Sequence, residues 1–167
     1  MLSLISRSLT STILFMLIAK CSLTGMAHAE SVDVDIDGDS NNIFIEQAIS
    51  SGSYALAIVI GDSNDINMIQ TGTGNKTAIV DINGNNANVN INQKDGGSHY
   101  TYIDIDGQHD ANILQEGSGS HSANVSLYGT GSWNFNLNQS SSYTNYSWNG
   151  SGNCGGYGTC NYYVNQY

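Results

Sequence analysis

The sequence predicts an all-β fold, a parallel β-solenoid in which rungs of about 23 residues, each with two strands, stack into two facing sheets. Two residue columns and one alternation pattern carry this prediction. A glycine recurs every 22 or 23 residues, at Gly38, Gly61, Gly84, Gly107 and Gly129. A glutamine recurs every 22 to 24 residues, at Gln47, Gln70, Gln93, Gln115 and Gln139. Two residue types that keep one period over five copies indicate a stacked-repeat architecture.

Each repeat contains two segments in which every second residue is apolar, the pattern of a strand with one buried face. The first segment ends at the glycine, and its expected inward residues are Val32/Val34/Ile36, Ala55/Ala57/Val59, Ala78/Val80/Ile82, Thr101/Ile103/Ile105 and Ala123/Val125/Leu127. The second ends at the glutamine, with Ile43/Ile45, Ile66/Met68, Val89/Ile91, Ala111/Ile113 and Phe135/Leu137.

Turn-forming residues separate these segments. Residues 39–42 (Asp-Ser-Asn-Asn) and their counterparts join the two strands of a repeat, and glycine-rich stretches such as residues 71–75 follow the glutamine. Both compositions favour turns, because Gly and Asn tolerate a positive φ. Stacked rungs would place equivalent residues about 4.8 Å apart, an amyloid-like arrangement. We therefore expect the glutamines to form a buried ladder in which each amide pairs with the next.

Residues 30–145 are expected to form the five-repeat solenoid, and residues 146–167 a degenerate sixth repeat with an insert. The insert carries Cys154 and Cys160 on either side of a glycine-rich loop, and we expect a disulfide between them if the chain is secreted. Aromatic residues gather near this end of the chain and form either a final core layer or a docking surface: Tyr143, Tyr146, Trp148, Tyr157, Tyr162, Tyr163 and Tyr167.

Residues 1–29 have the features of a secretory signal peptide. Arg7 precedes an apolar run at residues 13–19 that is too short to cross a bilayer, and Ala27-His28-Ala29 fits a cleavage site. A short membrane anchor, or a lipoprotein signal ending at Cys21, are the alternatives. Cleavage would leave two basic residues against 14 acidic ones, a formal charge of −12. This charge disfavours binding to nucleic acid or to an anionic membrane surface, and no membrane insertion is expected after cleavage.

The repeats resemble those of curlin, the subunit of bacterial curli amyloid fibres. The likeness rests on the period, the copy number, the signal peptide and stretches such as residues 70–78 (Gln-Thr-Gly-Thr-Gly-Asn-Lys-Thr-Ala) and 115–123, and the end Asn165-Gln166-Tyr167 resembles the ending of the major curlin subunit. Two features differ from the family pattern, namely a glycine in one of the two columns and the lack of a glycine-rich segment before the first strand.

The resemblance implies a secreted subunit of an extracellular amyloid fibre in biofilms. Its implied partners are further copies of itself, an outer-membrane secretion pore, a chaperone and a nucleator. We expect assembly by head-to-tail stacking of solenoid ends, since the first and last strands would present unpaired backbone groups. A nucleating minor subunit of the same fibre and a monomeric β-solenoid adhesin remain alternatives.

The sequence gives only weak indications of a metal site or of catalysis. Asp33, Asp35 and Asp37 imitate half of a calcium-binding loop, but Phe44 stands where the pattern requires Glu. We expect these acids, with Asp81, Asp104 and Asp106, to stack on the outer face, to have raised pKa values and to slow assembly near neutral pH. The histidines His99, His109 and His121 are expected in solvated turns. No triad or metal-ligand spacing is visible, so the sequence predicts neither an enzyme nor a bound cofactor.

Overall fold

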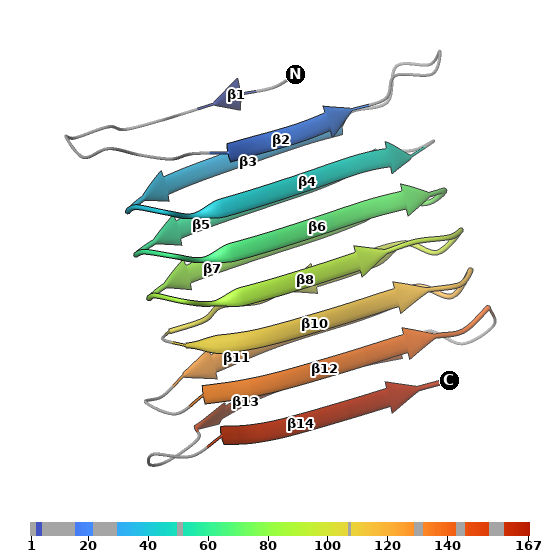
Figure 1. The fold of residues 1–167 in the computed structure, drawn as a ribbon. Coiled ribbons are helices and arrows are strands. Elements are labelled where there is room, and N and C mark those ends of the chain that lie inside the picture. Colours follow the sequence, from blue (N-terminus) through green and yellow to red (C-terminus); the bar gives the residue numbers. More distant parts are fainter. Residues whose placement is uncertain are drawn as a thin grey trace.

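The computed structural model describes residues 3–4, 16–21, 30–49, 52–106, 108–128, 132–142, 146–153 and 159–167. These residues form strands and turns and contain no helix (Figure 1). One seven-stranded sheet contains β1 (Ser3–Leu4), β3 (Glu30–Asp37), β5 (Ser53–Ile60), β7 (Lys76–Asn83), β9 (His99–Tyr102), β11 (His121–Tyr128) and β13 (Tyr146–Asn153). The other contains β2 (Met16–Cys21), β4 (Asn42–Ile49), β6 (Asp65–Gly72), β8 (Asn88–Gln93), β10 (His109–Glu116), β12 (Ser132–Ser140) and β14 (Thr159–Gln166).

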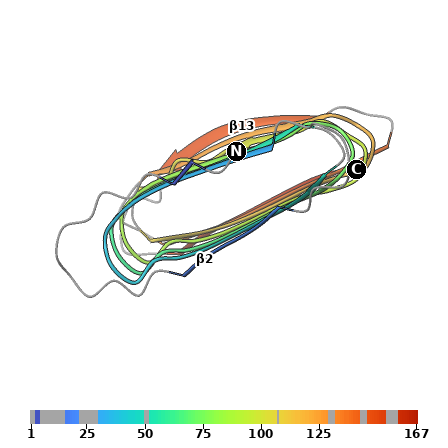
Figure 2. The ribbon, with the colours of Figure 1, turned by 90° about the horizontal axis from the view of Figure 1, so that it is seen from above.

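Every strand pair is parallel, and neighbours within each sheet are one repeat apart in sequence. Ala55 pairs with Ala78, and Gln70 pairs with Gln93. Viewed along the stack, the rungs superpose into a flattened ring whose long sides are the two sheets (Figure 2). The predicted parallel β-solenoid of two-strand rungs with a repeat of about 23 residues is therefore confirmed.

The core lies between the sheets and consists of small and medium aliphatic side chains. Ala55, Ala57 and Val59 of β5 face Ile66 and Met68 of β6, and all are fully buried. Alternating residues of the same strands are half-buried or exposed. This burial follows from the alternation in the sequence, because successive side chains of a strand point to opposite faces of the sheet.

The turns absorb the variation in repeat length. Three residues separate the inward-facing Ile105 and His109, whereas four separate Ile82 from Ala87 in the rung before. The strand β9 is also shorter than its counterparts and ends at Tyr102. Beyond it, Ile105 keeps the register through single bridges to Ile82 and Leu127.

Both ends of the stack carry strands outside the five central repeats. At one end, β13 and β14 form a sixth rung in which Gln166 pairs with Gln139. At the other, β1 pairs with β3 and β2 pairs with β4, with Cys21 opposite Gln47. The segment that we expect to be removed as a signal peptide therefore occupies the edge formed by β3 and β4 in the full chain.

Candidate assembly interface

The glutamines of the second strand form one continuous chain of hydrogen bonds through the core. Each side-chain Nε2 donates to the Oε1 of the next rung, over 2.7 Å from Gln47 to Gln70, 2.9 Å from Gln70 to Gln93 and 2.9 Å from Gln93 to Gln115. The chain continues over 2.8 Å to Gln139 and 2.8 Å to Gln166. We call these six residues the glutamine ladder.

The second amide proton of each central glutamine ties the two sheets together. The Nε2 of Gln93 also donates to the Thr77 carbonyl over 2.8 Å, and that of Gln115 donates to the Tyr100 carbonyl over 2.8 Å. Thr101 contributes its hydroxyl to Gln115 Oε1 over 2.8 Å. Buried amides are costly unless they are paired, and the central part of the ladder meets this requirement fully.

The ladder is open at both ends. The Oε1 of Gln47 is buried and has no hydrogen-bond partner among the described residues. At the other end Gln166 is only half-buried, and it accepts a hydrogen bond from Gln139 without donating one within the described part of the chain. One end of the ladder thus has an acceptor without a donor, and the other end has a donor without an acceptor.

The glycine column marks the tight turns, where successive backbones lie in close contact. A Cβ on Gly38 would lie 2.0 Å from the Gly61 carbonyl oxygen, and one on Gly61 would lie 2.1 Å from that of Gly84. Both glycines also have a positive φ, which side-chain-bearing residues rarely adopt. Gly107 and Gly129 lie outside the described residues.

Asparagine side chains reinforce these tight turns. Asn41 and Asn64 are buried, and Asn41 Oδ1 accepts hydrogen bonds from the Asn64 backbone N–H over 2.9 Å and from its side chain over 3.0 Å. Asn64 repeats the pattern with the backbone N–H of Ala87 over 2.9 Å. The turn is therefore held by the same rung-to-rung pairing as the strands.

The looser turns close over a column of buried polar residues that sequence analysis did not identify. Lys76 is fully buried, and its Nζ donates to the carbonyls of Thr73 over 2.5 Å and Asp95 over 3.1 Å, and to that of Gly97. Burial lowers the pKa of Lys76 to about 8, although Asp95 partly opposes this. The residues of this column, Ser53, Lys76, His99 and His121, each lie six positions after a ladder glutamine, namely Gln47, Gln70, Gln93 and Gln115. This constant offset was the signal in the sequence that could have identified the column.

The prediction that the three histidines lie in solvated turns is wrong. His99, His109 and His121 are each at most 2 % exposed and occupy inward positions at strand starts. His99 and His121 stack with ring centroids 5.0 Å apart, and their Nε2 atoms donate to the carbonyls of Lys94 and Glu116 over 2.9 Å each. Burial lowers the pKa of His99 to about 4, and Lys76 and His121 add to this. Sequence reasoning failed here because each histidine lies two residues before the first inward residue assigned to its strand, at a position that was taken as part of the turn.

The prediction of stacked carboxylates on the outer face is wrong for the first rung. Asp33, Asp35 and Asp37 pair with the aliphatic residues Leu56, Ile58 and Ile60 of β5 rather than with acids. In later rungs burial raises the pKa of Asp81, and the neighbouring Asp104 raises it further. The outer acids therefore form one close pair rather than a continuous column.

The two ends of the solenoid differ sharply in charge. The N-terminal rung (β3 and β4) contains Glu30, three aspartates and Glu46, and Asp39 lies in its turn. No Asp, Glu, Lys or Arg occurs after Glu116, so the C-terminal rung (β13 and β14) is uncharged in its side chains. In that rung Tyr162 is 51 % exposed and stacks on Phe135 at 6.1 Å, and Tyr163 and Tyr167 are more exposed still.

The remaining candidate groups add no further site within the described residues. Cys160 is disulfide-bonded, and Cys154 lies outside the described residues. No cluster of three metal-ligating side chains occurs in the described ranges, and none of their elements is a helix able to span a membrane. Comparison of the chain with known protein families, with curated proteins and with solved structures finds no match.

Proposed function

We propose that this chain is the structural subunit of an extracellular, curli-like amyloid fibre that grows by head-to-tail stacking of solenoids. The open glutamine ladder carries the proposal. A buried acceptor at Gln47 and an available donor at Gln166 are complementary and lie at opposite ends of one continuous column. Because an unsatisfied buried polar atom costs about 1–3 kcal/mol, joining the two ends is favourable.

The register within the chain defines the junction. If the next copy continues the stack, Gln166 faces its Gln47, Tyr162 faces its Ile43 and Tyr163 faces its Phe44. The exposed ring of Tyr162 would then be buried against the core column that it already continues. Main-chain hydrogen bonds of β13 and β14 would extend to β3 and β4 of the next copy, as in other cases of β-strand addition.

Charge favours one polarity of growth. Two acidic N-terminal rungs brought together would repel each other. An acidic rung that meets a rung without charged side chains is repelled less. The complementary ladder ends impose the same polarity. Head-to-tail stacking is thus the arrangement that pairs both ends of the glutamine ladder and brings no acidic side chains into contact.

Secretion would control when growth begins. In the full chain β1 and β2 cover the edge of β3 and β4, and cleavage after Ala29 would uncover it. The implied partners are a secretion pore, a chaperone that keeps the chain unfolded and a nucleator, and the implied setting is the biofilm matrix at the cell surface. A nucleating subunit would seed a partner subunit at trace amounts, and this behaviour distinguishes it from the main structural subunit.

Assembly kinetics of residues 30–167 and of the full chain test this proposal. We expect thioflavin-positive fibres from residues 30–167 and slower assembly of the full chain. On wild-type seeds, Gln166→Ala should slow elongation about tenfold, since the junction loses its ladder bond. Asn161→Ala, on the outward side of the same strand, is the matched control. A chain that stays monomeric for days at high concentration would contradict the proposal and favour the monomeric adhesin.

A further inference from the structure

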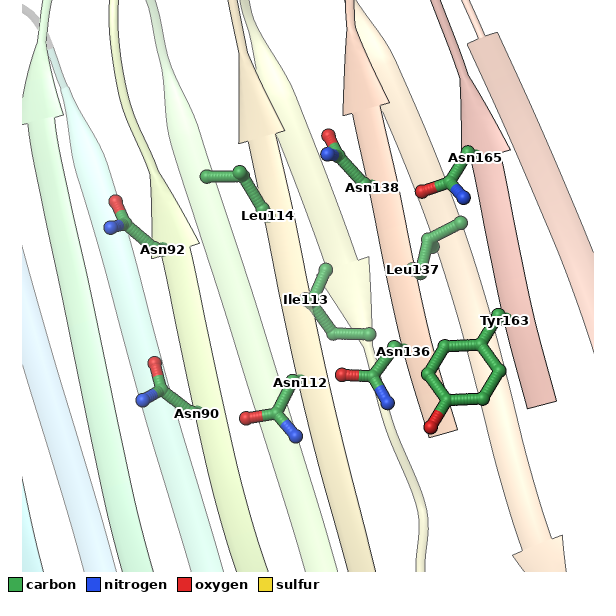
Figure 3. A pocket seen from close by; sticks show the side chains of 10 residues that line it. All are labelled: Asn90, Asn92, Asn112, Ile113, Leu114, Asn136, Leu137, Asn138, Tyr163 and Asn165. Carbon is green, nitrogen blue, oxygen red and sulfur yellow. The ribbon is translucent and has the colours of Figure 1, made fainter. Parts of the chain in front are cut away.

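A shallow groove of about 420 Å³ lies on the outer face of the sheet that contains β2 to β14, across β8, β10, β12 and β14 (Figure 3). Strand register builds it from two rows of side chains that run across the strands. One row contains Asn90, Asn112, Asn136 and Tyr163, and the other contains Asn92, Leu114, Asn138 and Asn165. We call it the asparagine groove.

The amides of this groove lack partners of their own, in contrast to the glutamine ladder. The side chains of Asn90, Asn92 and Asn112 form no hydrogen bond within the described residues. Asn136 donates once, to Asn134 over 2.8 Å, and Asn138 Oδ1 is buried without a partner. Each amide offers two donors and an acceptor, so the groove presents many unused hydrogen-bonding groups of both kinds in fixed rows.

The groove contains no charged side chain. A charged ligand would lose hydration there without meeting a counter-charge. A second copy of this chain is also disfavoured as the occupant, because every copy carries a formal charge of −10 and lateral approach brings like charges together. The occupant that fits is therefore electrically neutral and rich in groups that both donate and accept.

We propose that the asparagine groove binds an uncharged, extended polysaccharide that lies along the solenoid axis. Sugar hydroxyls both donate and accept, as the amides require. Tyr163, which is 65 % exposed at one end, offers an aromatic face for the apolar side of a sugar ring. Each row offers one side chain per rung, about every 4.8 Å, so an extended sugar chain that lies along the solenoid axis passes several amides in succession. The groove lies within one chain, and the inference holds whether or not the chain assembles.

Equilibrium dialysis of fluorescent cellohexaose against the full chain tests the proposal in either assembly state. We expect saturable binding that the double variant Asn112→Ala/Asn136→Ala weakens about tenfold, since two amides are lost. The control Asn83→Ala/Asn124→Ala removes two outward amides from the other sheet and should leave binding unchanged. Asn112→Thr/Asn136→Thr raises strand propensity and should also weaken binding, with an unchanged circular dichroism spectrum.

Three results would overturn the proposal. These are the absence of cellohexaose binding, equal binding by the groove variant and the control variant, and equal binding of an anionic galacturonate hexamer. If the wild-type chain does not bind cellohexaose and the groove substitutions abolish lateral bundling of fibres, the groove binds a second copy of the chain instead. Thioflavin kinetics of the same variants keep this test separate from that of fibre assembly, because the groove variant should elongate at the wild-type rate.

Discussion

Replacing Gln70 by leucine tests the energetic role of the glutamine ladder. Within the described residues Gln47 Nε2 donates only to Gln70 Oε1, and Gln93 Oε1 accepts only from Gln70 Nε2. Gln70→Leu therefore leaves two buried side-chain atoms without partners, at about 1–3 kcal/mol each, and it also removes the weaker hydrogen bond of 3.2 Å from Gln70 Nε2 to the Tyr54 carbonyl. The larger apolar surface of leucine offsets about 1 kcal/mol. We expect a net loss of about 3 kcal/mol in the free energy of unfolding.

The ladder also predicts that a second mutation restores stability. Gln47→Leu alone leaves one atom unpaired, Gln70 Oε1, and removes the Gln47 oxygen that already has no partner. In Gln47→Leu/Gln70→Leu the only ladder atom left newly unpaired among the described residues is Gln93 Oε1. The bond to the Tyr54 carbonyl is lost in both Gln70 variants and cancels in the comparison. The double variant should thus be more stable than Gln70→Leu by about 1–2 kcal/mol, an interaction that a double-mutant cycle isolates.

Guanidinium unfolding followed by far-ultraviolet circular dichroism, at concentrations where the chain is monomeric, measures these values. Met68→Leu on the same strand is the matched control, because a volume-conserving core substitution costs less than about 1.5 kcal/mol. If Gln70→Leu proves no more harmful than Met68→Leu, or if the two leucine substitutions are simply additive, the ladder is not the coupled network described above.

Three further perturbations have defined outcomes. Gly61→Ala should lower the free energy of unfolding by about 3 kcal/mol or more, because the φ of Gly61 is +125° and an added Cβ would collide with the Gly84 carbonyl. The control Gly96→Ala, where the nearest contact of an added Cβ is a side-chain oxygen at 3.3 Å, should change it by about 0.5 kcal/mol or less, and equal effects of the two variants would contradict the tight-turn geometry. The pKa of His99 is lowered to about 4 from 6.5 in the folded chain. The contribution of neutral His99 to stability is therefore complete above pH 6.5, and the free energy of unfolding should decline by about 1–3 kcal/mol toward pH 4. An equal decline in His99→Phe would show that His99 is not the group responsible. Lys76→Met should destabilise by about 2 kcal/mol, as the carbonyls of Thr73, Asp95 and Gly97 lose their shared donor, whereas unchanged unfolding curves would show that these carbonyls do not need it.

The fold could be predicted because a solenoid repeats one local unit, a rung of two strands and two turns. Alternation in a single repeat identifies two strands, and the common period of Gly61 and Gln70 with their counterparts then places each rung on the next. Parallel stacking follows, because only in-register rungs bury every apolar column together. The ladder geometry follows from the same register.

Polar inward positions and the outer face were harder to predict. Lys76, His99 and His121 break the apolar alternation, and their burial depends on backbone carbonyls that the looser turns supply only once folded. The outer neighbours of Asp33 and Asp35 depend on residue-by-residue register with the next rung, where Leu56 and Ile58 replace acids. The asparagine groove combines residues of four repeats and is visible only when the strands lie side by side.

Electron cryomicroscopy of fibres grown from residues 30–167 measures the central claim most directly. Six rungs at a spacing of about 4.8 Å give an axial rise of about 29 Å per subunit. We expect this rise, with unbroken strand spacing across each junction and Gln166 of one copy beside Gln47 of the next. A junction with antiparallel strands, a different register or a gap between rungs would contradict end-to-end continuation of the ladder.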